Sequence, residues 1–501
     1  MTTAVLWYRS DLRAHDHPAL TTAVREYERV VPVFVFDDAL LHGRFRSAPR
    51  SDFMLGCLRA LDEHLCRLGS GLAIRSGAPE QVLVALAAEL RADAVLWTSD
   101  VSPYARARDA RVTEALRAAG VAARPHGGGY VVDVSKPRTR SGTPYHVFSP
   151  FHRSWRELDR RELCAAPRGL PPLPSRLRKG RMPRTIAELG LDAGAVVPEP
   201  VVAPGEAAAR RAARAWLDGP VDRYAERQNG MARLETSILS PYLRWGCLSA
   251  GELEQRAAAR AGKGAAAWVR QLCWRDFYAH VLLMWPGNAR AEFQERMRGL
   301  EWEDPRLHLS AWQRGETGYP VVDAGMRQLA RTGWMHNRAR LIVGSFLTKD
   351  LHIDWREGER WFERLLLDGE PAQNNGNWQW IASVGTDPAP AYRRIYNPTL
   401  QARRFDPGGE YVRAHVPELR NVPDDKLLEP WTMSETEQRR AGCRIGRDYP
   451  APVVDHKHER ERALARYAGG LTDRSARSHK RDRAAASSTC GLGSSSCRDQ
   501  K

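Results

Sequence analysis

Short apolar segments alternate with longer amphipathic segments over residues 4–124. The apolar segments predict β-strands at residues 5–8, 30–36, 72–74 and 94–97. Helical periodicity lies between them, at residues 51–68, 79–91 and 104–119. This order predicts a parallel sheet with helices on both faces. No GxGxxG follows the first strand, and Gly127-Gly128-Gly129 lacks the Lys-Ser/Thr of a phosphate loop, so neither kind of nucleotide site is predicted.

The second half of the chain is helical in pattern almost throughout. One predicted helix ends before Gly333 and carries an apolar face made of Val322, Met326, Leu329 and Ala330. Residues 165–205, in contrast, are rich in Pro, Gly, Ala and Arg without periodicity. We therefore predict an α/β fold class: a Rossmann-like parallel-sheet domain at 1–130, a linker at 131–205, an all-helical domain at 206–468 and a disordered tail at 469–501.

The charge of the chain favours a polyanionic partner. The formal net charge is +16 and the pI is about 9.7, which indicates nucleic acid most simply. The eight Cys show no CxxC pairing and no zinc spacing with His, so they indicate reduced thiols of a cytoplasmic protein, and no metal site is predicted. No signal-like segment and no apolar run of membrane-spanning length is present, so we expect no membrane.

The densest motif extends from Asp368 to Asp387, with the sequence DGEPAQNNGNWQWIASVGTD. Its amide and indole groups can line a flat, electron-rich ring system. A second dense run extends from Gly318 to Phe362. The two runs resemble the flavin-binding domain of the photolyase/cryptochrome family, and the opening VLWYRSDLRAHDHPAL resembles the start of that family's antenna domain. The residues alone leave open an ordinary helical core that happens to be rich in Trp.

The resemblance implies a non-covalent FAD in the helical domain. The segment LETSILSPYLRWGCLS resembles the family's phosphate-binding segment, and a helix start at Ser240-Pro241 would direct backbone N–H groups at an anion. Asp368 and Arg340 match an ion pair along the isoalloxazine ring, and Asn374 matches the residue that faces flavin N5. A turn-forming role for Asn374 is the alternative. The implied FAD-binding residues are Tyr224, Thr236, Ser237, Ile238, Leu239, Ser240, Trp268, Arg340, Asp368, Gly369, Glu370 and Asn374.

Three tryptophans align with the family's electron-transfer chain, in the order Trp378, Trp355, Trp302 from the flavin to the surface. Indoles suit electron hopping because their radical cations are accessible. Each of the three could instead pack in the core, which is the usual place of Trp in a helical domain.

The substrate pocket resembles that of enzymes for cyclobutane pyrimidine dimers. Residues 268–285 predict one long helix, with Gln271, Trp274 and Tyr278 on one face. The resemblance implies catalytic roles for Asn374, Gln271, Trp274 and Asn337, and DNA contacts by Gln271, Trp274, Arg275, Tyr278, Asn337, Arg338, Trp380, Arg394 and Gln401. A solvated helix face is the alternative for each Arg.

The chain departs from the family pattern at three places. Enzymes for the (6–4) photoproduct carry His-His where this chain has His336-Asn337, which argues against that lesion. Dimer-repairing relatives usually have Glu at the position of Gln271. The usual Arg-Asp after the conserved Tyr is replaced by Arg227-Gln228-Asn229, which puts one DNA contact in doubt.

The resemblance therefore implies a carbon–carbon lyase that uses light to split cyclobutane pyrimidine dimers in DNA, by electron transfer from excited reduced FAD to a flipped-out dimer. A signalling cryptochrome is the main rival, and a DNA-binding flavoprotein without repair is a more distant one. Arg50 and Asp100 favour 8-hydroxy-5-deazaflavin over methenyltetrahydrofolate as a second, antenna chromophore, with solvated loop charges as the alternative. We expect a monomer that binds UV-damaged DNA, needs no obligate protein partner, and is cytoplasmic and associated with the nucleoid.

Overall fold

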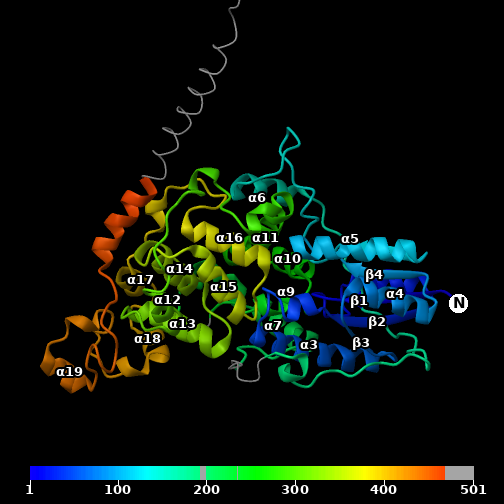
Figure 1. Ribbon diagram of the computed structural model, residues 1–501, viewed down its shortest axis with the longest axis horizontal. Coiled ribbons are helices and arrows are strands. Elements are labelled where there is room, and N and C mark those ends of the chain that lie inside the picture. Colours follow the sequence, from blue (N-terminus) through cyan, green and yellow to red (C-terminus); the bar gives the residue numbers. More distant parts are fainter. Residues whose placement is uncertain (192–198, 234, 469–501) are drawn as a thin grey trace, which may run out of the picture.

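The structure is a computed structural model that describes residues 1–191, 199–233 and 235–468. The predicted disordered tail, 469–501, lies outside the described residues. Figure 1 shows an elongated molecule with the sheet at one end and a mass of helices at the other. This arrangement confirms the predicted fold class, an α/β domain followed by a helical domain.

Five parallel strands form the sheet in the order β3-β2-β1-β4-β5. Their bounds are β1 (Thr3–Tyr8), β2 (Arg29–Phe36), β3 (Ala73–Ser76), β4 (Ala94–Thr98) and β5 (Ala122–His126). The first four confirm the predicted strands. The fifth, AARPH, was not predicted, because this edge strand has no fully buried residue and contains Pro125.

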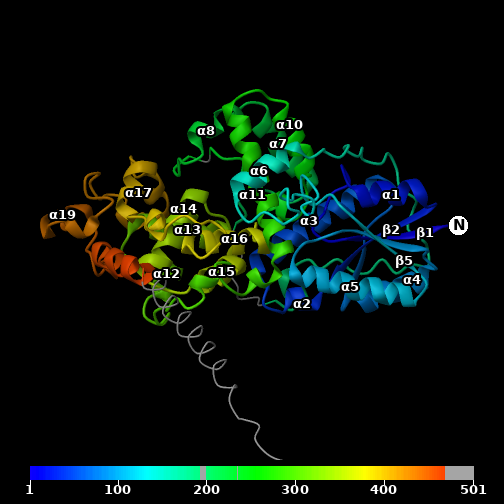
Figure 2. The same ribbon diagram turned by 90° about the horizontal axis from the view of Figure 1, so that it is seen from above.

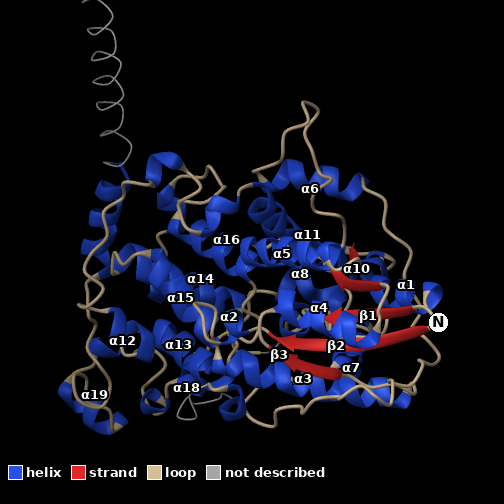
Figure 3. Cartoon of the chain, turned by 45° about the vertical axis from the view of Figure 1, so that its right-hand side comes forward, coloured by secondary structure: helices blue, strands red, loops and turns tan. Residues whose placement is uncertain are grey.

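Helices cover both faces of the sheet (Figures 2 and 3). They are α1 (Pro18–Glu26), α2 (Asp38–Leu41), α3 (Ala48–Arg67), α4 (Pro79–Leu90) and α5 (Pro103–Ala118). Alternate side chains of β1 enter different cores: Leu6 and Tyr8 pack with α1 and α3, whereas Val5 and Trp7 pack with α4 and α5. The core on the α3 side continues into the helical domain, so the two domains share buried apolar surface.

The helical domain follows a connecting region that itself contains one substantial helix, α6 (Phe148–Glu157). The further α-helices are α7 (Glu206–Leu217), α8 (Tyr224–Arg227), α9 (Ser240–Arg244), α10 (Ala250–Ala258), α11 (Lys263–Met284), α12 (Leu309–Arg314), α13 (Pro320–Thr332), α14 (Asn337–Ser345), α15 (Trp355–Leu365), α16 (Pro371–Ala382), α17 (Pro398–Phe405), α18 (Glu410–His415) and α19 (Glu435–Ala441). A π-helical turn, η5 (Phe346–Asp350), continues α14. A last helical segment covers residues 456–468.

The helix predicted before Gly333 is α13, and Gly333 ends it in the left-handed conformation (φ 65°). Val322, Met326 and Leu329 are fully buried, as predicted. Ala330 is exposed, which corrects the fourth position of the predicted apolar face.

Helix α16, which carries the Asn/Trp motif, lies between α11 and α15. Two glycines allow this close packing. A Cβ on Gly376 would lie 2.1 Å from the ring of Tyr278 on α11, and a Cβ on Gly358 of α15 would lie 2.2 Å from the ring of Trp378. Only residues without a side chain fit at these two contacts, so the motif is fixed against both neighbouring helices.

Within the described ranges, no helix is both long enough and apolar enough to span a bilayer. The same residues contain no group of three or more His, Cys, Asp or Glu side chains arranged to bind a metal ion.

Candidate active site

Asp368 is the centre of a polar cluster between α9, α14 and α16. Its carboxylate is nearly buried and accepts hydrogen bonds from the Ser240 hydroxyl (2.6 Å) and from the Arg340 guanidinium (2.9 Å). Arg340 also donates to the carbonyl oxygen of Met335 (2.8 Å). Ser240 begins α9, with Pro241 in its first turn, as predicted. The structure thus brings together three residues that lie 28 to 128 positions apart in the sequence.

Two oxygen atoms of this region are buried and have no hydrogen-bond partner among the described residues. They are Asp368 Oδ1 and Thr236 Oγ1. An unpaired buried oxygen is costly unless a further group satisfies it. A hydroxyl and a carboxylate that are free to bond are suitable contacts for a hydroxyl- and phosphate-bearing cofactor, so the residues present fit FAD.

Aromatic side chains flank the same region. The indole N–H of Trp268 donates to the Ser237 hydroxyl (3.3 Å). Trp216 packs against both Trp268 (ring centroids 6.2 Å) and Tyr224 (5.9 Å). Trp216 on α7 was not predicted as part of the site, because a lone Trp in an Ala/Arg-rich helix carries no motif. Leu239 is buried and Ile238 has a positive φ of 48°, a left-handed conformation that is rare for a β-branched residue.

Asn374 is buried on α16 and faces α15. Its amide donates to the Glu359 carbonyl oxygen (2.9 Å) and, more weakly, to the Glu363 carboxylate (3.4 Å). Asn375 donates to the Glu359 carboxylate (3.0 Å). Burial raises the pKa of Glu359 to about 7, against the opposing effect of the hydrogen bond from Asn375. These two glutamates were not predicted, because the spacing of α15 against α16 is a tertiary feature.

The three predicted electron-transfer indoles differ in exposure. Trp378 and Trp355 are buried, and Trp302 is half-buried. Trp378 packs against Phe362 (5.0 Å) and against a further indole, Trp312 (6.2 Å), which was not predicted. Trp355 donates its indole N–H to Glu292 (3.3 Å). Trp302 is thus the most exposed of the three, and their order from flavin to surface stays a prediction.

Four of the predicted lesion residues lie on α11 and α16. Gln271 is exposed, Trp274 is half-buried, and Tyr278 is buried against Gly376. The Trp274 ring stacks on Phe148 of α6 (3.6 Å, 3°). On α16, the Trp380 indole N–H donates to Asp387 (3.1 Å).

Three arginines were predicted to contact DNA, and their placements differ. Arg338 is partly exposed, stacks over Phe405 (4.2 Å) and donates to Asn229 (2.6 Å), a residue of the tripeptide that departs from the family pattern. Arg394 is nearly buried over the Trp380 ring (4.1 Å). Arg275 lies at the domain interface, where it pairs with Glu370 (3.1 Å).

The placements of Arg275 and Glu370 do not support their predicted contacts. Arg275 donates to the Gly129 carbonyl oxygen (2.8 Å), so its guanidinium points into the sheet domain rather than toward a DNA surface. Glu370 accepts from Arg275 and from the Tyr130 hydroxyl (3.2 Å), and it faces a cavity separate from the Asp368 cluster. Asp368 and Glu370, which lie two residues apart just before α16, thus face two different parts of the molecule.

Asn337 is exposed at the first turn of α14, and Gln401 lies on the neighbouring helix α17. The pKa of Tyr396 is raised by burial, against the positive charges of Arg338 and Arg394, so both arginines lie near this side chain. The predicted DNA residues of α14, α17 and the segment after α16 therefore belong to one continuous region.

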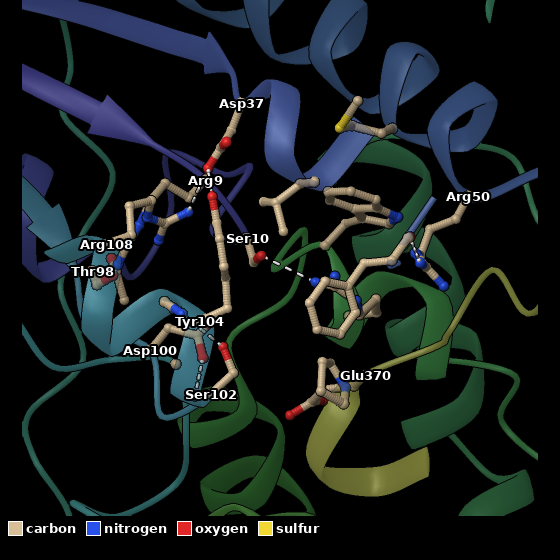
Figure 4. Close-up of a pocket in the computed structure, with 18 of the residues that line it drawn as sticks. Arg9, Ser10, Asp37, Arg50, Thr98, Asp100, Ser102, Tyr104, Arg108 and Glu370 are labelled. Carbon is tan, nitrogen blue, oxygen red and sulfur yellow. Dashed lines mark hydrogen bonds and ion pairs between the residues drawn. The ribbon is translucent and has the colours of Figure 1, made fainter. Parts of the chain in front are cut away.

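A cavity of about 180 Å³ lies at the carboxyl ends of β1, β2 and β4, where the sheet meets the helical domain. In an open parallel sheet this is the usual place of a bound ligand. Figure 4 shows Asp37, Asp100 and Tyr104 on the sheet side and Glu370 on the opposite side. The cavity walls combine charged and aromatic side chains, and the aromatic ones include Tyr8, Phe36, Phe45, Tyr104, Tyr130 and Trp245.

Both predicted antenna residues line this cavity. Burial would raise the pKa of Asp100, but the Ser102 backbone N–H and the charges of Arg9 and Arg108 lower it below its ordinary value, so Asp100 stays ionised. Arg50 has its charge paired with Glu363 (2.8 Å) and donates to the Phe45 carbonyl oxygen (2.7 Å). Arg50 therefore shapes the wall of the cavity more than it offers a free charge.

Comparison with known proteins identifies the family. A family model described as "DNA photolyase" matches residues 4–174, and one described as "FAD binding domain of DNA photolyase" matches residues 268–469. The chain belongs to the DNA photolyase family. This photolyase-family chain is 40% identical to a deoxyribodipyrimidine photo-lyase of Streptomyces griseus over 466 residues, which cover 92% of this chain and 98% of the relative.

Solved structures agree with this assignment. A bacterial class III photolyase from Agrobacterium tumefaciens superposes with a TM-score of 0.87 at 34% identity, covering 94% of this chain and 98% of that one. A cryptochrome of Synechocystis superposes with a TM-score of 0.85 at 29% identity, covering 93% and 99%. The fold is therefore common to proteins named photolyase and a protein named cryptochrome, so fold alone does not assign the function.

Proposed function

We propose that this protein is a DNA photolyase that splits cyclobutane pyrimidine dimers in UV-damaged DNA by light. The observation that carries the proposal is the cluster of Asp368, Arg340 and Ser240, with the two unpartnered oxygens beside it. When bound, reduced FAD supplies one electron to the dimer after excitation by light. Asp368 and Arg340 would bind and orient the ring system, and the hydroxyls of Thr236 and Ser237 would be available to its polar chain.

Asn374 supports repair over signalling. A carboxamide can orient toward flavin N5 without supplying an acidic proton, because its pKa is far outside the physiological range. Glu359 and Glu363 hold the Asn374 amide in place. This arrangement favours a flavin that stays reduced and anionic, as repair requires, over one that cycles between oxidised and radical forms, as cryptochrome signalling requires.

Trp274 and Trp380 would form the aromatic walls for an extruded dimer. A lesion leaves the duplex at low cost because its bases are already poorly stacked and paired. Phe148 holds the Trp274 ring from behind, and Asp387 holds Trp380 through its indole N–H. Asn337 and Arg338, at the start of α14, would contact the bases and the backbone beside the lesion.

Binding in the dark tests the pocket separately from the photochemistry. We expect the protein to bind an oligonucleotide with one thymine dimer more tightly than the undamaged oligonucleotide. Stacking on an aromatic side chain is worth about 1–3 kcal/mol per base, so Trp274→Ala should remove about tenfold or more of that preference. Trp431→Ala, a partly buried indole outside the pocket, is the matched control. Equal preference in Trp274→Ala and wild type would contradict the pocket.

Gln271 is the residue that distinguishes this pocket from those with Glu. Its amide can donate to a pyrimidine O4 and accept from N3–H at once, whereas a carboxylate only accepts. We predict that Gln271→Ala weakens dimer binding by about 1–3 kcal/mol, because buried base edges lose their partner. Gln271→Glu should bind dimers with a pH dependence that the wild type lacks. Unchanged binding by Gln271→Ala would show that the contact is not made.

The cavity of the sheet domain is the proposed antenna site, and its aromatic walls suit a planar chromophore. We predict uptake of 8-hydroxy-5-deazaflavin by purified protein, seen as added absorption in the violet-blue. Asp100→Ala, which removes the ionised group on the cavity wall, should weaken this uptake, whereas Asp424→Ala, at an exposed ion pair, should not. Uptake of methenyltetrahydrofolate in place of the deazaflavin would reverse the assignment.

We also propose that the protein acts as a monomer on DNA, in the cytoplasm and in association with the nucleoid, without an obligate protein partner. The net charge of +16 supports the association with DNA.

A further inference from the structure

The last helical segment, residues 456–468, packs across the outer end of the indole chain. In Figure 1 it is the red helix along the edge of the helical domain. Tyr467 donates its hydroxyl to the Ala382 carbonyl oxygen (2.7 Å) and accepts from the buried Lys349 (2.8 Å), so this segment is tied to the C-terminal end of α16. The neighbouring residue, Arg466, lies over the ring of Trp302 at 4.7 Å.

Arg466 is held in this position by three carbonyl oxygens and by the side chain of Tyr467, whose ring lies 5.2 Å from the guanidinium. Its guanidinium donates to the carbonyl oxygens of Thr348 (2.7 Å), Glu301 (3.2 Å) and His352 (3.4 Å). Among the described residues, no carboxylate forms an ion pair with it. Two nearby acids are paired elsewhere: Glu303 binds Arg462 (2.5 Å), and Glu459 binds Arg462 and His352 (2.8 Å each). The third nearby acid, Glu301, is exposed to solvent. Arg466 therefore keeps a net positive charge on the face of Trp302.

The middle indole has the opposite environment. Arg356 also lies over the Trp355 ring (4.8 Å), but this guanidinium is paired with Glu292 (2.7 Å) and Asp354 (2.9 Å). The Trp355 indole N–H itself donates to Glu292. Two carboxylates thus outweigh one cation at Trp355, whereas among the described residues the cation over Trp302 has no ion-paired carboxylate. A positive charge opposes a radical cation, so oxidised Trp302 is destabilised relative to oxidised Trp355.

An oxidised indole can escape this repulsion by losing its N–H proton. No described residue accepts a hydrogen bond from the Trp302 N–H, and the side chain is half-buried, so the proton can pass to solvent. A neighbouring positive charge lowers the pKa of such a group, because it disfavours the form that carries the proton. The neutral indole radical that remains cannot take its electron back without recovering a proton.

We propose that Arg466 promotes loss of the indole proton from oxidised Trp302, and so makes electron supply to the flavin site irreversible on a short timescale. Trp302 gives one electron to oxidised Trp355, its N–H proton goes to water, and an external thiol later restores the hydrogen atom. This inference rests on the proposed function of Trp302 as the terminal electron donor. Arg466 acts through Trp302 and is thus a positioning residue.

Flash spectroscopy on the oxidised holoenzyme tests the proposal, because the cationic and the neutral indole radical absorb differently. A unit charge at 4.7 Å from a half-exposed ring shifts the pKa of the indole radical cation by about one unit. Arg466→Met should therefore slow the conversion of the cationic to the neutral Trp302 radical by about tenfold. Arg466→Lys should be intermediate, because it keeps the charge without the stacked geometry. Arg460→Met, an exposed arginine on the same helical segment, should match wild type.

The outcomes separate the inference from the proposed function. If Trp302→Phe abolishes the solvent-exposed radical while Arg466→Met and Arg466→Lys convert at the wild-type rate, the role of Arg466 is wrong and that of Trp302 stands. If Trp302→Phe leaves the radical signal intact, the terminal donor is another residue and both ideas fail. Thermal unfolding and repair by chemically pre-reduced holoenzyme should be unchanged in Arg466→Lys, which controls for loss of the helix.

Discussion

Asp368→Ala is expected to leave most of the purified protein without FAD. The substitution removes the acceptor of both Ser240 and Arg340, and it leaves the Arg340 guanidinium without its only carboxylate partner in the described residues. Breaking a fully buried ion pair from one side costs about 3–5 kcal/mol, and the lower part of this range applies here because the Arg340 side chain is 25% exposed. We expect FAD affinity to fall by about 100-fold or more, since each 1.4 kcal/mol is about tenfold.

Equilibrium titration of the apoprotein with FAD, followed by flavin fluorescence, measures this effect. Asp368→Asn should lose less, because the amide oxygen can still accept from Ser240. Asp424→Ala, which removes an exposed carboxylate paired with Arg413, is the control and should bind FAD as the wild type does. Equal affinity in Asp368→Ala and the control would show that the cluster is structural only.

Trp302→Phe is expected to block light-driven reduction of the oxidised holoenzyme. Phenylalanine is much harder to oxidise than tryptophan, so the step at this position gains a barrier of several kcal/mol, and the rate should fall by about 100-fold or more. Repair by chemically pre-reduced holoenzyme should remain close to wild type, because that reaction runs from the flavin to the lesion and does not use the surface indole.

Absorption spectra under steady illumination with a thiol reductant give the rate of light-driven flavin reduction. Dimer loss in anaerobic light gives the rate of repair by the pre-reduced holoenzyme. Trp431→Phe, an indole that packs on Tyr319 outside the chain, should change neither. Parallel loss of both activities in Trp302→Phe would mean that Trp302 supports the fold and does not carry electrons.

The fold was predictable where local pattern and burial agree. The first four strands have nearly continuous apolar sequences because both faces of the parallel sheet are covered. β5 escaped prediction because an edge strand that has no fully buried residue and contains Pro125 has no such pattern. The apolar face of α13 could be predicted from the spacing of its apolar residues. The exposure of Ala330 could not, because it depends on which other segments pack against the helix.

The individual site residues could be predicted only from the resemblance to the photolyase/cryptochrome family. The geometry of the site could not be predicted, because it depends on packing between segments that are distant in the sequence. Asp368, Arg340 and Ser240 meet in one cluster as expected. Arg275 and Glu370 belong to the same sequence motifs as their neighbours, but their side chains point toward the sheet domain. The reason is that α11 and α16 both border the domain interface. No local pattern shows which side of a helix meets a second domain.

Residues without a motif were missed for a related reason. Trp216, Glu359 and Glu363 become part of the site only through contacts between helices. Arg466 is one of many arginines in the sequence, and its relation to Trp302 exists only because Tyr467 fixes the last helical segment against α16.

Light-dependent loss of cyclobutane dimers tests the central claim most directly. Purified holoenzyme, chemically reduced under anaerobic conditions, would be mixed with UV-irradiated oligo-dT, and dimers would be counted after equal times in blue light and in darkness. We predict dimer loss in the light, none in the dark, and none in the light with Asp368→Ala protein that lacks FAD. Unchanged dimers in the light, or repair of (6–4) products with dimers left intact, would contradict the account.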